Sequence, residues 1–282
     1  MSGPRTLAAR EARLAWLLMT PALAALAVMA AGPLLATMWE SLFRHDLRLP
    51  WLGRTFAGAG NYVEAAVDPR FRQALAQTAG FTVASVALEL CLGLLLALAL
   101  DALTRLRGLA RVVVLLPWAL PTVVAAVVWR FMFERGDWLS ASPSAWVPIV
   151  LGDVWKTTPF VALLLLAGLQ GIDRSLHEAA RLDGATAWRR FVHITWPLLR
   201  PAVVVALVFR TLDAFRVFDL VFVLTGGGPG TSTEVVSLYA FTALLQHLRF
   251  GYGSALSVIV FLVGFALALL YVRALAPARS TR

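Results

Sequence analysis

The chain has 282 residues, of which 60% are hydrophobic, and its mean hydropathy is +0.77. This composition excludes a soluble globular protein, in which about 45–50% of residues are apolar. The formal charge of +9 does not indicate nucleic-acid binding, because the basic residues lie in short segments between apolar runs. A membrane protein with arginine-rich cytoplasmic loops carries the same kind of charge.

Six apolar runs are each long enough to cross a bilayer core, which takes about 20 helical residues. They cover 14–39, 74–100, 112–130, 146–169, 201–224 and 254–272. The first run follows three arginines, as in a signal peptide, but it is longer than a signal sequence and contains Pro21 and Pro33. We therefore predict six transmembrane helices between short tails at 1–13 and 274–282.

The arginines predict the orientation of these helices. The two tails, the adjoining Arg273 and the loops at 101–111 and 170–200 together hold 14 arginines, against about eight on the opposite side. Five of those eight lie in the long 40–73 segment, and the charge of a long loop has less influence on whether the loop is translocated. Both termini are therefore predicted to be cytoplasmic.

The cysteine and histidine residues indicate neither a disulfide nor a metal site. Cys91 is the only cysteine and lies in an apolar run, so an intrachain disulfide is excluded. The four histidines are scattered along the chain, and we predict no metal site.

The fifth run carries four charged residues at membrane depth, where ionisable groups are costly and often functional. Arg210, Asp213, Arg216 and Asp219 recur every three residues with alternating sign, so each acid can meet a base one turn away. One interpretation is a set of ion pairs that holds the helices together. The other is a polar stripe that faces a water-filled pathway and binds a polar solute.

The fourth run carries a second polar group. Asp153 and Lys156 are three residues apart and could pair. Thr157 offers a hydroxyl, and Phe160 offers an aromatic face of the kind that packs against a sugar ring, although such a residue more often faces lipid or the core. In the second run, Glu89 is a weaker candidate, and its simplest role is a pair with an arginine of a neighbouring helix.

The segment LTGGGPGTSTE at 224–234 follows the fifth run. Its glycines and proline end a helix and form a tight turn on the outer side. It lacks the lysine and the following serine or threonine of a phosphate-binding P-loop, so we do not assign nucleotide binding to it.

The longest cytoplasmic loop, 170–200, is basic and rich in helix formers. We predict a first helix capped by Ser175, with Glu178 completing a capping box, and a turn at Gly184. A second helix is predicted from about Thr186 to just before Pro197. From spacing alone, this hairpin could lie on lipid headgroups or contact a protein.

The same loop resembles the EAA loop of ABC importer permeases. The residues that match the family pattern are Glu178, Ala179, Ala180, Gly184, Ile194 and Pro197, and Trp196 stands where the family usually has leucine. The resemblance implies an all-α integral membrane protein, with six transmembrane helices in the type I ABC importer permease fold. It also implies a cytoplasmic coupling helix that docks on an ATPase through Glu178, Ala179, Ala180, Asp183 and Gly184.

Further motifs resemble the carbohydrate-uptake branch of this family. NYVEA at 61–65, LTGGGP at 224–229 and FGYGSA at 250–255 look like maltose-type permeases, and VWKTTPF and LVFRTLDAFRVFD look similar to permeases of actinobacterial trehalose importers. The resemblance implies import of a disaccharide across the bacterial inner membrane. The implied partners are a second homologous permease, two cytoplasmic ATPase subunits that bind ATP and magnesium, and a periplasmic or lipid-anchored sugar-binding protein. No cofactor and no enzymatic activity are expected in this chain itself.

In the maltose-type permeases, the sugar is held by the helices on either side of the EAA loop. By position, the resemblance implies sugar contacts from Asp153, Lys156, Thr157, Phe160, Arg210 and Ala214. Phe160 replaces an aromatic hydroxyl and Arg210 replaces a small polar residue, which changes the chemistry of the site. Together with Asp213 and Arg216 of the charged stripe, these residues form the candidate substrate pathway.

Two other functions are less compatible with the sequence. A secondary transporter could use Asp213 or Glu89 for proton coupling, but six helices without an obvious inverted repeat argue against it. A membrane enzyme would need an acid–base pair at a membrane boundary, and the sequence shows none. The sequence therefore predicts a passive half-channel that is driven by ATP hydrolysis in partner subunits.

Overall fold

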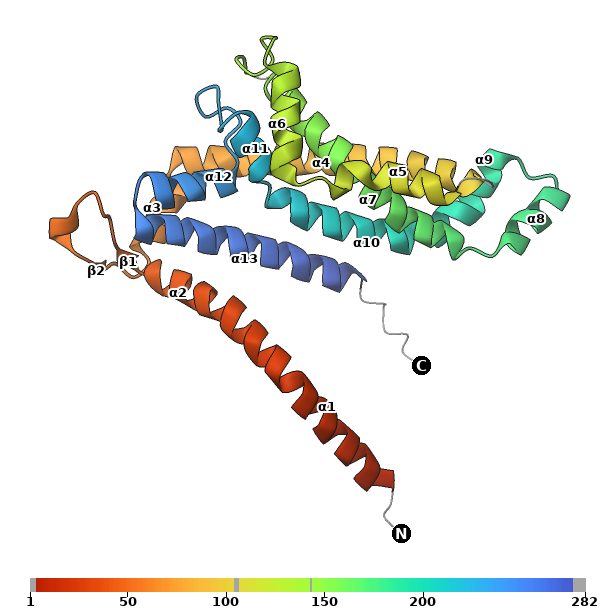
Figure 1. Ribbon diagram of the computed structural model, residues 1–282, viewed down its shortest axis with the longest axis horizontal. Helices are drawn as coiled ribbons and strands as arrows, with labels where there is room; N and C mark the ends of the chain where they lie inside the picture. Colours follow the sequence, from red (N-terminus) through yellow and green to blue (C-terminus); the bar gives the residue numbers. More distant parts are fainter. Residues whose placement is uncertain (1–3, 104–106, 143, 276–282) are drawn as a thin grey trace. The chain divides into compact units, whose positions relative to one another are not determined.

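The computed structural model describes residues 4–103, 107–142 and 144–275. Most of the predicted tail at 274–282, and Arg105 of the 101–111 loop, lie outside these residues. The described chain is mostly helical, so the predicted all-α class is confirmed. It divides into two compact units, which consist of Met1–Ala66 with Ala240–Ile259 and Val67–Tyr239 with Val260–Arg282 (Figure 1).

Within the described residues, five helices are long and apolar enough to cross a membrane, and a bent pair of helices forms a sixth candidate. They are Ala9–Glu40, Pro69–Ala102, Gly108–Ala119 with Thr122–Phe133, Trp146–Gln170, Ala187–Phe215 and Phe250–Arg273. Each of the six apolar runs therefore has a counterpart in the structure. Several helices nevertheless begin and end at residues other than those predicted.

The first unit begins with α1 (Pro4–Leu26) and α2 (Gly32–Glu40), which a π-helical turn joins into one rod. The rod starts well before residue 14, because the polar N-terminal residues are also helical. Strands β1 (Phe43–Arg44) and β2 (Thr55–Phe56) then pair antiparallel. The remaining elements here are a 3₁₀ turn (Pro50–Leu52), α3 (Gly60–Val67), a π-helical turn (Thr242–Gln246) and the start of α13 (Phe250–Leu275).

Three long helices form the core of the second unit. They are α4 (Pro69–Ala102), α7 (Trp146–Gln170) and α10 (Trp196–Phe215), and residues of all three share one buried cluster. Helices α4 and α7 approach closely at Gly93, where a Cβ atom would lie 2.6 Å from Cγ1 of Val161. Any larger residue at this position would push the two helices apart.

The third apolar run is not one helix. Helices α5 (Arg107–Ala119) and α6 (Thr122–Phe133) meet at an angle of 83°. The break falls at Leu120 and Pro121, since a proline disfavours helical backbone at the residue before it. The prediction of a continuous helix over 112–130 is therefore wrong.

The fifth run also differs from the prediction of a helix over 201–224. Helix α10 continues from α9 (Ala187–Arg190) through a π-helical turn (Phe191–Thr195), so the predicted stop before Pro197 is wrong. Pro197 lies at the start of α10, directly after the π-helical turn. At the other end, α10 stops at Phe215, and Asp219–Leu224 forms a separate helix, α11.

Candidate functional site

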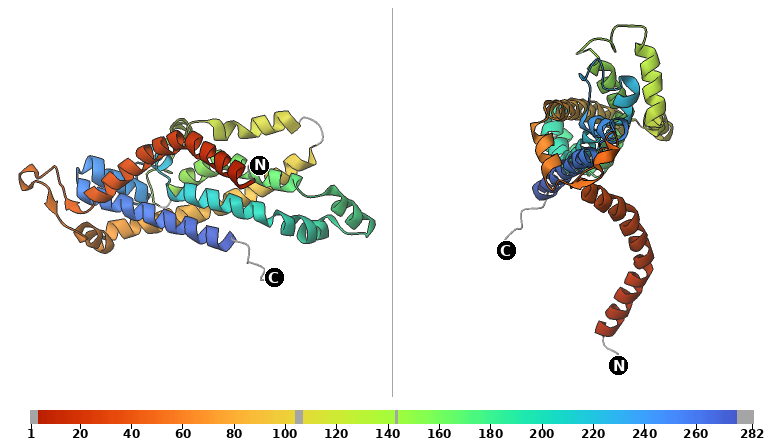
Figure 2. Two further views of the ribbon diagram at one scale, coloured as in Figure 1. Left: turned by 90° about the horizontal axis from the view of Figure 1, so that it is seen from below. Right: turned by 90° about the vertical axis from the view of Figure 1, so that its left-hand side faces the viewer.

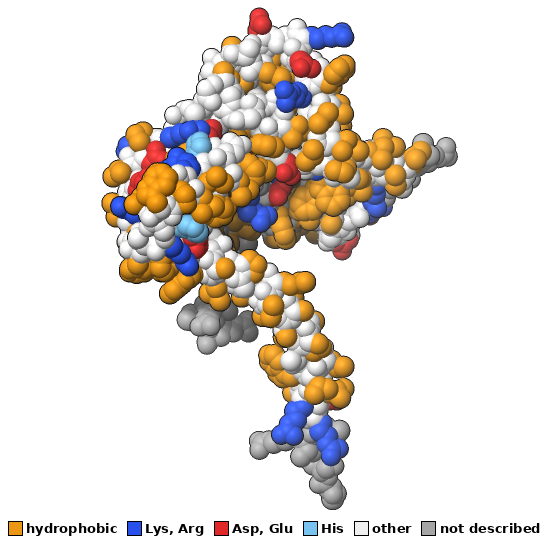
Figure 3. Space-filling view, turned by 60° about the vertical axis from the view of Figure 1, so that its left-hand side comes forward, with side chains coloured by type: hydrophobic (Ala, Val, Ile, Leu, Met, Phe, Trp, Pro, Cys, Tyr) orange, Lys and Arg blue, Asp and Glu red, His pale blue; other side chains and the backbone are white. Residues whose placement is uncertain are grey.

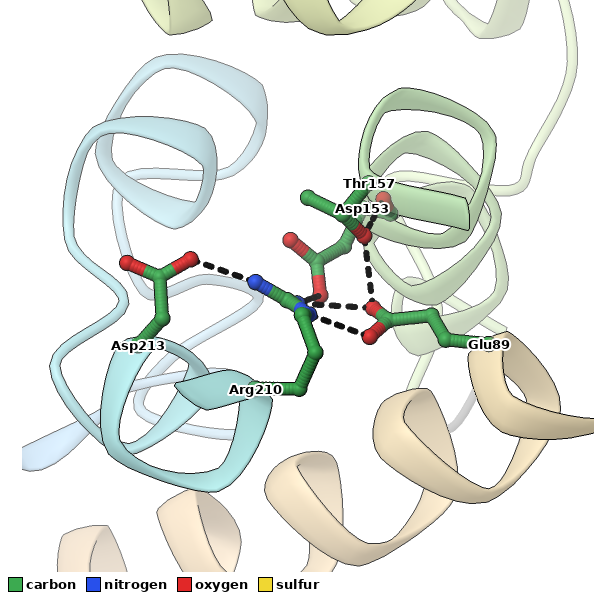
Figure 4. A network of polar contacts seen from close by, with 5 residues as sticks. All are labelled: Glu89, Asp153, Thr157, Arg210 and Asp213. Carbon is green, nitrogen blue, oxygen red and sulfur yellow. Dashed lines mark hydrogen bonds and ion pairs between the residues drawn. The ribbon is translucent and has the colours of Figure 1, made fainter. Parts of the chain in front are cut away.

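A buried arginine joins three helices of the second unit (Figure 4). Arg210 of α10 donates two hydrogen bonds to Glu89 of α4, and the one from Nη2 to Oε1 is 2.7 Å long. The same Nη2 lies 3.2 Å from Oδ2 of Asp153 on α7. Nη1 donates to Asp213, one turn further along α10, and the hydroxyl of Thr157 donates to Oε1 of Glu89 at 2.7 Å. We call these five residues the ion cluster.

Burial explains why every charged side chain of the ion cluster is paired. Arg210 is 1% exposed and Glu89 is 0% exposed, and a charge removed from water is costly unless it is paired and hydrogen-bonded. A guanidinium has five N–H groups, and Arg210 uses four of them on its three carboxylate partners. Arg210 therefore ties α4, α7 and α10 together and has little capacity left for a solute.

Two of the predicted contacts are confirmed and one is wrong. Arg210 pairs with Asp213 one turn away, and Glu89 pairs with an arginine of a neighbouring helix. Asp153 pairs with Arg210 and not with Lys156. Within the residues that the structure describes, half-buried Lys156 makes no ion pair or hydrogen bond.

The other candidate pathway residues lie outside the ion cluster. Phe160 stacks on Trp118, with ring centroids 5.7 Å apart, and meets Phe209 edge-on at 6.5 Å. Ala214 is buried directly after Asp213, and Arg216 is exposed at the end of α10. The structure thus brings together four of the eight predicted pathway residues, namely Asp153, Thr157, Arg210 and Asp213.

Helix α10 ends immediately after the ion cluster. The amides of Arg216 and Val217 close its last turn on the carbonyls of Asp213 and Ala214. The chain is then non-helical until α11, in the middle of a run that was predicted to cross the membrane. Irregular backbone at such depth is tolerated where it is buried in protein or lines a water-filled cavity. The side chain of Asp213, beside this break, is 63% exposed although it contacts Arg210.

The second candidate site is the hairpin that α8 (Arg174–Leu182) forms with α9 at one end of the second unit (Figure 2). Its first helix is capped by Asp173, whose carboxylate accepts the amide of Ser175 at 2.9 Å. This hydrogen bond lowers the pKa of Asp173 below its ordinary value. The predicted cap at Ser175 is wrong, because Asp173 reaches the free amides of the first turn from two residues earlier.

The turn of the hairpin is as predicted. Gly184 has φ of 76°, a left-handed conformation that residues with a Cβ atom rarely adopt. Its amide donates to the carbonyl of Arg181, and the amide of Ala185 donates to that of Ala180 at 2.9 Å. These two bonds form a Schellman motif, which satisfies the last carbonyls of α8. The second helix begins at Ala187, as predicted, and Thr186 caps it.

The hairpin exposes the residues that the sequence pattern assigned to coupling. Glu178, Ala179, Asp183 and Gly184 are exposed, and Ala180 is half-buried. Beside them opens a groove of about 390 Å³, which is lined by Ala180, Ala185, Arg189, Arg190, His193 and Ile194. Within the described residues, the carboxylate of Glu178 has no partner, so it is available to a basic group of another molecule.

Sequence reasoning missed two apolar residues of this hairpin and the central acid of the ion cluster. Leu182 is 91% exposed and Trp188 is 71% exposed, although both belong to a polar segment. The sequence signal that could have identified them is a single apolar residue between charged ones. Glu89 was predicted to be a weaker candidate than the charged residues of the fourth and fifth runs. It nevertheless belongs to a buried polar face of α4, whose other members, at spacings of three or four, are Thr78, Thr82 and Ser85.

Comparison with known proteins identifies the family of the chain. Residues 89–281 match the family described as binding-protein-dependent transport system inner membrane component. The chain is 41% identical over 280 residues to the trehalose/maltose transport system permease protein MalF of Thermococcus litoralis, and the match covers 94% of each chain. It is 41% identical over 263 residues to the trehalose transport system permease protein SugA of Mycobacterium tuberculosis, with coverage of 89% and 85%.

A solved structure shows the same fold. It is a bacterial ABC transporter involved in the import of the acidic polysaccharide alginate, and it superposes with a TM-score of 0.78. The match covers 94% of this chain and 96% of that chain at 21% identity. The six apolar candidates thus have the fold of an ABC importer permease. By sequence and by fold, the chain belongs to the family of inner membrane components of binding-protein-dependent transport systems.

Proposed function

We propose that this chain is the permease subunit of an ATP-driven importer of a disaccharide, trehalose or a maltose-like sugar. The observation that carries the proposal is 41% identity along almost the whole chain to a permease named for trehalose and maltose. The chain pairs with a second homologous permease, two cytoplasmic ATPase subunits that bind ATP and magnesium, and a sugar-binding protein. It lies in the inner membrane with both termini cytoplasmic.

The hairpin is the docking surface for an ATPase subunit. Its unpaired Glu178 offers a charge, and the exposed Leu182 and Trp188 offer apolar anchors. Large apolar side chains of this kind carry most of the binding energy in protein interfaces. A lipid surface is the alternative partner, because the hairpin also carries Arg174, Arg181, Arg189 and Arg190, which attract anionic headgroups.

Movement of the hairpin reaches the ion cluster through a single rod. Helix α9, the π-helical turn and α10 are continuous from Ala187 to Phe215. Arg210 lies 22 positions after Trp188, which corresponds to about 33 Å at 1.5 Å per residue. Because Arg210 is tied to α4 and α7, displacement of the rod by the ATPase moves these helices together and rocks the half-channel between inward- and outward-facing states.

The sugar interacts with groups that the ion cluster leaves free. Asp213 exposes most of its carboxylate at the break after α10, and Lys156 has no partner in the described part of the chain. Phe160 and Trp118 supply stacked aromatic faces. In this arrangement Arg210 fixes the position of Asp213 and does not itself bind sugar.

The test is uptake by the complete transporter in proteoliposomes. Labelled trehalose should accumulate only when ATP and the sugar-binding protein are both present, and unlabelled maltose should compete. Uptake driven by a proton gradient in the absence of ATP would refute the proposal. For the hairpin, the double variant Leu182→Ser/Trp188→Ser should weaken ATPase binding about tenfold, or about 1.4 kcal/mol. The matched control is Trp51→Ser, which removes an equally exposed tryptophan outside the hairpin.

A further inference from the structure

One charged side chain near the middle of a candidate span has no partner within the described residues. Lys156 lies ten residues after the start of α7, so about 15 Å of helix separates it from the nearer end. Along the rod of α1 and α2, by contrast, the basic side chains lie near the N-terminal end and hydrophobic ones follow (Figure 3). Lysines near helix ends extend to the membrane interface, whereas an ionisable group at the centre of a span faces a cavity or a partner.

The ion cluster beside Lys156 contains more acids than bases. Its three carboxylates share the single guanidinium of Arg210, and they belong to Glu89, Asp153 and Asp213. The side chain of Asp213 is 63% exposed, so water can solvate it, but that of Asp153 is only 13% exposed. A buried carboxylate is costly unless it is paired and hydrogen-bonded. Asp153 is therefore the acid that gains most from a second basic partner.

Asp153 also has the loosest hold on Arg210. Its Oδ2 lies 3.2 Å from Nη2 of Arg210, and the same Nη2 donates to Oε1 of Glu89 at 2.7 Å. Arg210 donates a second hydrogen bond to Glu89 from Nε. The hydroxyl of Thr157 also donates to Glu89, so α4, α7 and α10 stay joined if Asp153 leaves Arg210. Because hydrogen bonds weaken as they lengthen, a small displacement of α10 along α7 is enough to release Asp153.

Lys156 is placed to receive the released carboxylate. Asp153 and Lys156 are three residues apart on α7, which puts them on one face of the helix, in the order of acid and base that favours pairing. Phe160 lies one turn further along the same face and stacks on Trp118. Along α7, Lys156 therefore stands between the ion cluster and the aromatic faces of the proposed sugar site.

We propose that Asp153 exchanges its partner during transport, pairing with Arg210 in one arrangement and with Lys156 in the other. In the arrangement seen here, Lys156 is free to donate hydrogen bonds to sugar hydroxyls. In the other arrangement, Asp153 holds Lys156 away from the sugar. The sugar therefore binds more tightly to the first arrangement, and such a difference lets a transporter bind solute on one side and release it on the other. This inference rests on the proposed function, which places the sugar beside Lys156 and Phe160.

Uptake of labelled trehalose by the complete transporter in proteoliposomes tests the exchange with a double-mutant cycle. At saturating trehalose, Lys156→Met should lower the maximal rate about tenfold, because the release arrangement loses its ion pair. In an Asp153→Asn background, the same substitution should change the rate by less than about twofold, since the partner is already gone. Lys156→Arg keeps the charge and should retain most of the wild-type rate. An equal fold loss in both backgrounds would overturn the proposal, because a lysine that only contacts the sugar acts independently of Asp153.

Chemical labelling gives a second measurement that does not need active variants. Lys156 is the only lysine of the chain, so the mass gain of the intact chain beyond that of its N-terminal amine reports reaction at this residue. The small amine reagent methyl acetimidate should modify Lys156 about tenfold faster in one of two states, nucleotide-free or trapped with ADP and vanadate. Asp153→Asn should remove this difference, and the matched control Asp213→Asn should keep it.

The outcomes of the two experiments separate the exchange from the proposed function. Equal reactivity of Lys156 in both wild-type states, or a difference that persists in Asp153→Asn, would overturn the exchange. Equal yields of assembled complex show that the variants fold. Uptake that depends on ATP but shows none of these effects would refute the exchange alone, whereas uptake without ATP would refute the proposed function.

Discussion

The ion cluster and the α8–α9 hairpin are both rich in charged residues, but these residues are paired within the chain in the first and exposed in the second. In the ion cluster, one guanidinium and three carboxylates from three helices contact one another, and Arg210 and Glu89 are almost fully buried. In the hairpin, Glu178 and Asp183 are exposed, and the apolar residues beside them are exposed as well. A buried charge must be paired inside the chain, whereas a docking surface must keep its groups free for another molecule.

The two regions are also parts of one element. The rod from Ala187 to Phe215 begins in the hairpin and carries Arg210 and Asp213 near its other end. A change in the hairpin should therefore affect coupling while the bundle stays folded. A change in the ion cluster should affect the bundle itself. Four variants test this distinction, from the largest expected effect to the smallest.

The largest effect is expected from Arg210→Met. It leaves Glu89 and Asp153 without their basic partner in a buried site, and such breakage costs about 3–5 kcal/mol. The yield of monodisperse protein and its resistance to heating in detergent should both fall sharply. Arg216→Met is the control, because Arg216 is exposed and outside the ion cluster. If Arg210→Met were as stable as Arg216→Met, the ion cluster would not hold the helices together.

The second effect is expected from Gly184→Val in the hairpin turn. A β-branched residue is strained at φ of 76°, by about 1–3 kcal/mol, although nothing within 4 Å blocks its Cβ atom. Sugar-stimulated ATP hydrolysis should be lost while the bundle keeps its thermal stability. Gly184→Asn should retain most of the activity, since asparagine tolerates left-handed backbone. Full activity of the valine variant would show that the turn is not needed for coupling.

The third effect is expected from Glu178→Lys. Reversing an exposed charge leaves the fold unchanged but places a like charge against a basic group of the ATPase. Affinity for the ATPase should fall about tenfold, which is about 1.4 kcal/mol. Glu134→Lys makes the same charge change at an exposed site outside the hairpin and should bind normally. Normal binding of both variants would remove Glu178 from the docking surface.

The smallest effect is expected from Asp173→Ala, which removes the cap of α8. Hydrogen exchange of the Ser175 amide should become faster, while uptake changes little. The lowered pKa of Asp173 means that the ionised cap stabilises the helix above its ordinary pKa and that this contribution is lost as the pH falls through the lower, folded value. Exchange protection should therefore be constant from about pH 6 to 8, where the carboxylate is ionised in both states. Asp173→Asn should keep the cap and show no loss of protection in acid.

Local sequence signals predicted much of this molecule. The six apolar runs, the turn at Gly184 and the start of the second hairpin helix at Thr186 all follow from composition or from the needs of a few neighbouring residues. The family pattern predicts that the hairpin is a docking element. These features are determined locally, since hydrophobic length and backbone conformation act over a few turns.

Only the tertiary structure decided how the polar residues pair. Asp153 lies closer in sequence to Lys156 than to Arg210, yet it pairs with Arg210, because the packing of α7 against α10 brings these two side chains together. For the same reason, Glu89 lies at the centre of the ion cluster. The break after Phe215, and the exposure of Leu182, Trp188 and Trp51, likewise depend on where the rest of the chain lies. The sequence determined which groups need a partner, either within the chain or in another molecule. Packing determined which of them find that partner within the chain.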